Sequence, residues 1–399
     1  MRRKPVAVGD LQFGMYIAEL DRPWTETPFA FQGFRLRTEQ QLQALRRICK
    51  HVFIDHSRDE PRPGGVAKAA PPPSSAAGFA ILGTAGYTAQ ANLKREIEAA
   101  SELYSRASVA LQELLQPLDQ GATALDGGEV HRLVAALADS VIRNPDALLL
   151  VSRVRETGVA AHARALQVSA YMMVCGRFLQ REPDEIRLLG LLGLLQDVGK
   201  ARLPGALFET PGPFAPEAAE LLRKHVELSA HIVGVTSGLP PRFANLVLLH
   251  HERQDGTGYP RGLRGYQIGL SGSIAAICDA YDALLAPPPH GEGRSPGEAL
   301  KLLARERGSA FHGPLLEQFI RCMGAFPVGS AVELTSGELG VVVGEHLMQR
   351  LKPKVHLLLD GAGKPLASRK VVDLASEPQL RVRRTLAEGQ IAFDPRRLF

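Results

Sequence analysis

The sequence feature that most restricts the fold is a long stretch of helical periodicity, between about residues 89 and 326. Apolar residues recur there every three to four positions, as Leu93, Ile97 and Ala100 show. Comparable segments follow at residues 129–143, 159–180 and 185–196. This spacing gives each helix an apolar face that must be buried against another helix. Because the alternation typical of strands is nearly absent from this stretch, we expect a mainly α fold built as a helical bundle.

Two smaller units that contain strands flank the helical stretch. In residues 1–56, short strand-like runs surround one helix, so we expect a small α+β domain. Residues 57–88 are rich in Pro, Gly, Ala and Ser, which predicts a flexible linker. The helical domain then occupies residues 89–326, with its core at about 130–326. Short β-type runs separated by Gly and Pro predict a β-rich segment and tail over 327–399.

Composition limits the partners and the compartment. The 47 Lys and Arg against 42 Asp and Glu give a net charge of +5, which is too dilute over 399 residues to indicate a nucleic acid polymer as ligand. The four cysteines are far apart and form no CxxC pair, which argues against a zinc knuckle or a disulfide scaffold. The sequence also lacks a secretory signal and an uncharged apolar run of 18 residues, so we expect a cytoplasmic protein with no membrane span.

Histidines are concentrated in the helical stretch, where eight of the 12 fall between His131 and His312. The most specific string is HHERQDGTGYP at residues 250–260, in which adjacent histidines precede an acid and a glycine-rich turn. Imidazole is a common ligand for zinc, iron and manganese, so His250 and His251 are candidate metal ligands. Taken alone, such a pair is more often a partly buried polar helix end.

Further acidic and imidazole side chains lie in apolar helical surroundings. Gln196 and Asp197 end a leucine-rich helix, where a carboxylate is costly unless it is paired or metal-bound. Comparable surroundings hold His162, His225 and Asp279. Asp282 follows one helical turn after Asp279, on the same face. A bundle can direct such side chains into one core site, and a carboxylate with flanking imidazoles suits a metal-dependent phosphohydrolase.

These motifs resemble the HD-GYP branch of the HD-domain phosphohydrolases, whose members hydrolyse the bacterial second messenger cyclic di-GMP. Residues 250–260 match the family's HHExxDGxGYP signature in full, and the resemblance extends over about residues 130–326. The N-terminal unit is similar to a small domain often found ahead of HD-GYP domains. The string FPVGSAVELTSGELGVVV resembles a segment that follows them. The resemblance implies an HD-type helical bundle for the middle of the chain.

The resemblance also implies roles for individual residues. The implied metal ligands are His162, Asp197, His225, His250, His251 and Asp279. Asp197 would bridge two ions of iron or manganese, and Asp197 and Lys200 would be the catalytic residues. The implied substrate contacts are Lys200, Tyr259, Arg261 and Arg264. Simpler roles stay open, because a lysine after a helix end also interacts with the helix dipole and loop arginines are commonly solvated.

One position departs from the family pattern in a way that affects chemistry. The histidine of the HD pair is Gln196 here, and a carboxamide oxygen is a weaker metal donor than imidazole. We therefore expect a cyclic di-GMP phosphodiesterase-type signalling protein with weakened hydrolysis and a weak or empty second metal site. Gly158 stands where some members carry a ligand for a third metal, which argues against a trinuclear centre.

Two other interpretations remain open. The chain could be a catalytically inactive cyclic di-GMP receptor, or a module that docks a GGDEF-domain protein through Gly258, Tyr259 and Pro260. It could also hydrolyse a different nucleotide. A Gln196→His change tests which interpretation holds. If it creates activity in a chain that otherwise only binds cyclic di-GMP, the receptor interpretation is favoured.

Overall fold

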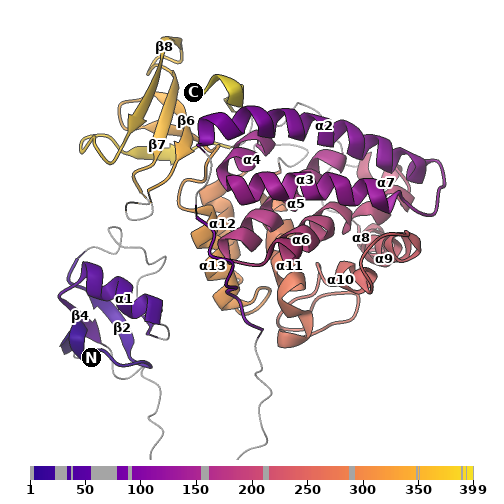
Figure 1. The fold of residues 1–399 in the computed structure, drawn as a ribbon, viewed down its shortest axis with the longest axis horizontal. Helices are drawn as coiled ribbons and strands as arrows, with labels where there is room; N and C mark the ends of the chain where they lie inside the picture. Colours follow the sequence, from indigo (N-terminus) through magenta and orange to yellow (C-terminus); the bar gives the residue numbers. More distant parts are fainter. Residues whose placement is uncertain are drawn as a thin grey trace, which may run out of the picture.

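The computed structural model describes most of the chain, and helices dominate the described part (Figure 1), so the predicted mainly α fold is confirmed. The described residues are 4–22, 34–36, 39–54, 79–88, 92–153, 161–209, 215–286, 293–346, 349, 351–387, 390–391 and 393–398. The predicted linker at 57–88 is therefore described only from residue 79, and Gly158 lies outside the described residues.

A four-stranded antiparallel sheet and one helix form the N-terminal unit. The strands follow the spatial order β1-β4-β2-β3 and are β1 (Lys4–Ala7), β2 (Tyr16–Leu20), β3 (Phe34–Arg35) and β4 (His51–Ile54). The helix α1 (Glu39–Ile48) buries Leu42 and Leu45 in the same cluster as Ile17 and Val52 of the sheet. This unit therefore has a hydrophobic core of its own.

The middle of the chain is a bundle of helices, predicted as such from its periodicity. Its helices are α2 (Leu93–Asp119), α3 (Gly127–Arg143), α4 (Pro145–Ser152), α5 (Ala161–Phe178), α6 (Pro183–Leu195), α7 (Ala206–Glu209), α8 (Pro216–Arg223), α9 (His225–Val235), α10 (Phe243–Val247), α11 (Gly269–Leu285), α12 (Pro296–Arg305) and α13 (Gly313–Met323). Two 3-10 turns, η4 (Val198–Arg202) and η5 (Gly265–Ile268), come directly after α6 and before α11. One apolar cluster runs through most of these helices.

The pair α5 and α6 forms the centre of the bundle and positions the polar residues discussed below. Every residue from Leu166 to Arg177 of α5 is buried. Gly193 of α6 lets the two backbones approach closely, because a Cβ there would lie 2.6 Å from the Cα of Ser169. The hydroxyl of Ser169 also donates to the carbonyl of Gly190 at 2.8 Å. This tight packing fixes the C-terminal end of α6, where Gln196 and Asp197 follow.

A five-stranded antiparallel sheet follows the bundle, in the order β8-β7-β6-β5-β9. Its strands are β5 (Ala331–Leu334), β6 (Leu339–Gly344), β7 (Lys354–Leu359), β8 (Pro365–Asp373) and β9 (Val382–Thr385). β5, β6 and β7 coincide with the β-type runs of the sequence at 330–333, 340–343 and 355–359, whereas β8 and β9 were not predicted individually. Apolar residues of α2 and α4 pack with Val341 and Val343 of this sheet, and the sheet lies beside one end of α2 (Figure 1).

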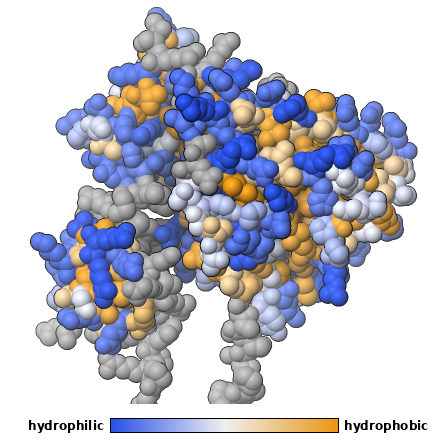
Figure 2. Space-filling view, in the orientation of Figure 1, coloured by the Kyte–Doolittle hydropathy of each residue, from blue (hydrophilic) through white to orange (hydrophobic). Residues whose placement is uncertain are grey.

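One helical run is long and apolar enough to cross a membrane by length and composition alone, namely Gly265–Leu285. However, 67% of its most apolar window is buried inside the fold, and it carries the buried acids Asp279 and Asp282. Figure 2 shows hydrophilic residues over the C-terminal sheet and much of the bundle, with apolar residues in smaller groups between them. We therefore describe this run as a core helix of the bundle.

Candidate metal centre

Four side chains that could donate to a metal ion converge at one end of the bundle, and we call them the four-donor cluster. They are Asp197 between α6 and η4, His225 at the start of α9, and His250 and His251 in the turn after α10. One donor atom from each lies within 4.8 Å of the others. The Oδ1 atom of Asp197 is 3.1 Å from Nε2 of His225 and 3.7 Å from Nε2 of His250. The structure therefore brings together four of the six residues predicted as ligands.

The outer nitrogens of two histidines set the direction of their inner lone pairs. Nδ1 of His225 lies 2.6 Å from the carbonyl of Leu222, and Nδ1 of His250 lies 2.7 Å from the carbonyl of Val247. A carbonyl only accepts, so Nδ1 is the nitrogen that holds the proton in the neutral form of each ring, and Nε2 is the nitrogen directed at the cluster. The two Nε2 atoms face each other at 3.3 Å, beside Oδ1 of Asp197. Two imidazole nitrogens and a carboxylate oxygen that converge in this way form a donor set that fits a cation.

Charges around Asp197 keep its carboxylate ionised. Burial alone would raise its pKa, but the ammonium of Lys200 and the hydrogen-bonding rings of His225 and His250 hold the pKa well below its usual value. Nζ of Lys200 is 2.6 Å from Oδ2 of Asp197, on the oxygen that faces away from the nearest histidine contact. Lys200 therefore neutralises one oxygen and leaves the other for the cluster.

The third histidine is coupled to the loop that follows it. The ring of His251 stacks on Tyr259, with centroids 4.7 Å apart and an interplanar angle of 22°. The guanidinium of Arg223 lies over the other ring of this pair, 5.4 Å from the Tyr259 centroid. Burial and the nearby His250 lower the pKa of His251 to about 3, so its ring is neutral near pH 7. A neutral ring is the form that binds a metal.

A buried glutamate ties this loop into a fixed shape. Glu252 is 1% exposed, and its two oxygens accept the backbone N–H groups of Arg261 and Leu263, each at 2.8 Å. Gly258 lies so close to the backbone of His251 and Arg253 that no side chain would fit there. The acid and the glycine of the HHERQDGTGYP string thus hold the loop against the cluster.

A second group of charges lies beside the cluster, and we call it the arginine half. The Nη2 atom of Arg164, on α5, is 2.8 Å from Oδ1 of Asp279, and its Nη1 atom is 3.0 Å from Oδ2 of Asp282. Nε of Arg164 also lies 3.8 Å from Oδ2 of Asp197. Burial raises the pKa of Asp279, but the charge of Arg164, with smaller contributions from His251 and Lys200, lowers the pKa overall.

Gln196 belongs to the same half. It is 1% exposed, its Nε2 donates to Oδ1 of Asp279 at 3.3 Å, and its Oε1 has no hydrogen-bond partner among the described residues. Sequence reasoning singled out Gln196 and Asp279 but missed Arg164. The available signal was an arginine in the first turn of a largely apolar helix, two residues after His162.

Comparisons with known proteins identify the family. The chain matches an HD domain over residues 149–315, a domain of unknown function (DUF3391) over 3–124 and a KOW domain associated with HD domains over 331–393. It is 33% identical over 379 residues to the cyclic di-GMP phosphodiesterase PA4108 of Pseudomonas aeruginosa, covering 94% of this chain and 90% of that one. The chain belongs to the HD-GYP family.

Other relatives match over shorter stretches. The response regulator RpfG of Xanthomonas campestris, named a cyclic di-GMP phosphodiesterase, is 29% identical over 229 residues, 55% of this chain and 58% of that one. A 3'3'-cGAMP-specific phosphodiesterase of Vibrio cholerae is 30% identical over 167 residues, 42% of this chain and 31% of that one. The solved structure of Bd1817, a HDG"Y"P protein from Bdellovibrio bacteriovorus, covers 80% of this chain and 98% of that one at 17% identity, with a TM-score of 0.47.

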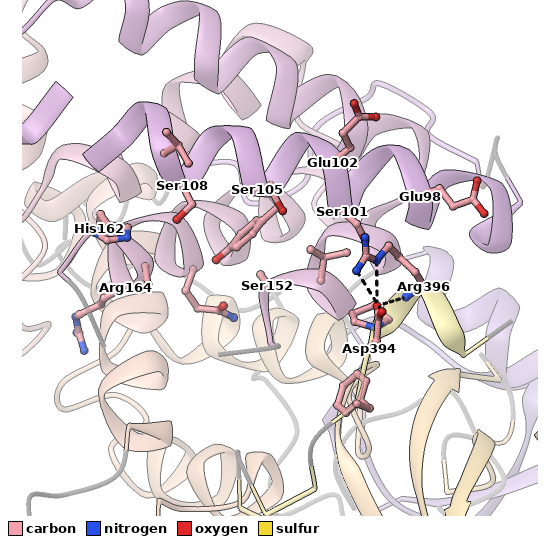
Figure 3. A pocket seen from close by; sticks show the side chains of 17 residues that line it. Glu98, Ser101, Glu102, Ser105, Ser108, Ser152, His162, Arg164, Asp394 and Arg396 are labelled. Carbon is pink, nitrogen blue, oxygen red and sulfur yellow. Dashed lines mark hydrogen bonds and ion pairs between the residues drawn. The ribbon is translucent and has the colours of Figure 1, made fainter. Parts of the chain in front are cut away.

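The structure places His162, the first ligand predicted from the HD-GYP pattern, away from the four-donor cluster. His162 lines a pocket of about 860 Å³ between α2, α5 and the C-terminal residues Asp394 and Arg396 (Figure 3). Gln167, 2% exposed, lines it too, and neither of its amide atoms has a hydrogen-bond partner among the described residues. A metal-binding role for His162 therefore stays a prediction.

The predicted substrate contacts of the HD-GYP loop have different exposures. The side chains of Arg261 and Arg264 are exposed, whereas Tyr259 is half-buried against His251. Arg264 pairs with Asp255 in an isolated β-bridge, which closes the base of the loop. The two arginines are thus free to meet an anion from solvent, and their role as substrate contacts stays a prediction.

Proposed function

We propose that this HD-GYP chain binds cyclic di-GMP at the four-donor cluster and hydrolyses it weakly. The observation that carries the proposal is the convergence of Oδ1 of Asp197 with the Nε2 atoms of His225 and His250, at 3.1 to 3.7 Å from one another. His251 and its loop border this set. The relatives named cyclic di-GMP phosphodiesterases support the choice of substrate.

A divalent ion fits the cluster, and its ligands would be Asp197, His225, His250 and His251. Bound there, it would supply Lewis-acid stabilisation of the charge that develops on the phosphoryl oxygens. The chain's own residues perform the other tasks. Lys200 holds Asp197 ionised and adds a positive charge near the phosphodiester. Glu252 holds the loop, so that Tyr259 covers His251 on the side of the substrate.

We attribute the weak hydrolysis to Gln196. In this structure its amide N–H group is directed at Asp279, where an imidazole would direct a lone pair at an ion. Even loss of an outer partner of a metal ligand commonly reduces affinity or activity by about 10–100-fold. We expect a reduction of at least this size here, because Gln196 stands at a position that the HD-GYP pattern gives to a metal ligand.

The test is hydrolysis of cyclic di-GMP by protein reconstituted with manganese or ferrous iron. We expect slow conversion to the linear dinucleotide, no conversion by Asp197→Ala, and at least about 10-fold faster conversion by Gln196→His. Asp184→Ala, an exposed acid of α6, is the control and should match the wild type. Fast turnover by the wild type that Gln196→His does not increase would contradict the weakening. Competition with 3'3'-cGAMP and GMP would reveal a different preferred nucleotide.

An inactive receptor is the second candidate, favoured by the amide of Gln196 and by the guanidinium of Arg164 beside it. Such a chain would bind cyclic di-GMP and release it unchanged even when fully loaded with metal. The loop around Gly258, Tyr259 and Pro260 would then be a docking surface for a GGDEF-domain protein. Binding of a purified GGDEF domain that is lost in Arg261→Ala and Arg264→Ala variants would support this docking.

A further inference from the structure

We propose that the guanidinium of Arg164 is a built-in second cation of this centre. The chain then takes up one divalent ion, at the four-donor cluster, and none beside Asp279. This inference rests on the proposed function only in placing an ion at the cluster. It makes the centre a mixed one, with a metal ion in one half and a side-chain cation in the other.

The contacts of Arg164 are those of a cation that serves several acids at once. Its Nη2 atom lies 2.8 Å from Asp279, and its Nη1 atom lies 3.0 Å from Asp282. Its Nε atom lies 3.8 Å from Asp197. Asp279 and Asp282 are 7% and 0% exposed, so each needs a positive partner inside the fold. The arginine comes from α5, whereas these two acids come from α11. Arg164 thus bridges two helices of the core through their charges.

The charge of Arg164 is permanent. A guanidinium does not lose its proton in proteins, and the carboxylates of Asp279, Asp282 and Asp197 raise its pKa further against the effect of burial. An ion bound by Asp279 would have to displace this group or share the carboxylate with it. Repulsion between two cations on one buried carboxylate disfavours sharing. Asp279 is therefore committed to Arg164.

Gln196 reinforces this commitment. Its Nε2 donates to Oδ1 of Asp279, the same oxygen that Nη2 of Arg164 contacts. The opposite amide orientation would place Oε1 against that carboxylate oxygen, where both atoms are acceptors. Two N–H donors therefore occupy one face of Asp279. Gln196 and Arg164 therefore act together against a second ion. The amide of Gln196 replaces an imidazole ligand, and the guanidinium of Arg164 occupies the carboxylate of Asp279.

Arg164 could instead be a phosphate-binding residue, but its surroundings argue against this. The side chain is only 24% exposed, and its two terminal nitrogens both contact carboxylates. Although Arg164 borders the pocket in Figure 3, its guanidinium points away from the serines of α2 there. The solvent-exposed Arg261 and Arg264 are better placed to meet a phosphate.

The test counts metal ions in the full chain by mass spectrometry after reconstitution with Mn²⁺ and gel filtration. We expect one ion per chain in the wild type and in Arg164→Lys, which keeps the charge. The double variant Arg164→Met with Gln196→His should hold two ions, because Asp279 is released and an imidazole is restored. Arg143→Met is the matched control, since it removes an arginine from another buried acid, Glu96, and should leave one ion.

Two ions per chain in the wild type would overturn the proposal, and this outcome does not depend on any variant folding. One ion in a folded double variant would overturn it as well. A second readout is thermal unfolding with and without Mn²⁺. The metal should raise the melting temperature of Arg164→Met more than that of the wild type, because it replaces the lost cation, and an equal rise in both would contradict the proposal.

Failure of this inference and failure of the proposed function can be told apart. Calorimetric titration of the metal-loaded wild type with cyclic di-GMP tests the function. Absence of binding would reject the function whatever the ion count. A count of two with normal binding would reject the role of Arg164 alone.

Discussion

The two halves of the polar centre, the four-donor cluster and the arginine half, surround their carboxylates with different groups. In the four-donor cluster, Lys200 pairs with one oxygen of Asp197. The other oxygen lies beside the Nε2 atoms of His225 and His250, which can bind a metal. In the arginine half, Arg164 brings a permanent positive charge to Asp279 and Asp282. The difference teaches that a buried acid is not by itself a metal ligand. What its neighbours present, lone pairs or N–H groups, decides whether it needs an ion.

The largest expected effect comes from Asp197, the acid that borders both halves. Asp197→Asn keeps the shape but removes the charge and adds an N–H donor, so we expect Mn²⁺ affinity to fall by more than about 100-fold. Calorimetric titration with Mn²⁺ measures this. Asp184→Asn, at an exposed site on α6, should leave the affinity unchanged. Tight Mn²⁺ binding by Asp197→Asn would show that Asp197 is not a ligand.

The next prediction compares the two side-chain cations in the absence of metal. Arg164→Met removes the guanidinium from two buried acids, Asp279 and Asp282, so we expect a loss of about 2–4 kcal/mol in the free energy of unfolding. Lys200→Met removes one contact to a single partly exposed acid, so we expect a loss of about 1 kcal/mol or less. Urea unfolding of both variants in chelator tests this order. A larger loss of stability in Lys200→Met than in Arg164→Met would contradict this order.

The helices of this protein follow from its periodicity, but the arginine half does not. A stripe of apolar residues identifies α2 and α3, and the HHERQDGTGYP string locates His250 and His251 by itself. By contrast, α5 is buried on all sides from Leu166 to Arg177, so its apolar pattern does not show which way Arg164 points. Its partner Asp279 lies 115 residues away, a contact that only the packed bundle creates.

The C-terminal sheet shows the same limit. β5, β6 and β7 are recognisable because most of their residues are apolar, and buried side chains make up most of β5 and β6 and half of β7. β9 has the sequence VRRT, with two exposed arginines that pair with Glu333 of β5. Such a strand owes its place to pairing with a neighbour across the sheet, which spacing along the chain does not reveal.

A smaller effect is expected from the loop that joins the cluster to solvent. Glu252→Gln replaces one accepting oxygen with an NH₂ group, which opposes the N–H of Arg261 or Leu263 and costs about 1–3 kcal/mol. Hydrogen exchange at those two amides should become faster, and cyclic di-GMP affinity should fall. Glu298→Gln changes a similar carboxylate at the start of α12 and should leave the loop amides protected. Unchanged exchange rates at these amides in Glu252→Gln would show that Glu252 does not hold the loop in place.

The smallest expected effect defines the pH response that belongs to neither half. His312 caps α13, where its Nδ1 accepts the N–H of Leu315, and burial lowers its pKa from 6.5. The unfolded chain therefore binds this proton more readily, so its contribution is complete above pH 6.5 and is lost as the pH falls below that value. His312→Asn keeps a cap that does not titrate and should remove up to about 1 kcal/mol of the pH dependence. Urea unfolding at several pH values checks this, and parallel curves for both proteins would contradict it.

The ion pairs of Arg164 also bear on how the chain is made. They join α5 to α11, two helices that leave the ribosome far apart in time. Because the positive charge is part of the polypeptide, this junction can close as soon as α11 is synthesised, without an ion from the cell. The pairing of α5 with α11 therefore does not depend on the supply of metal.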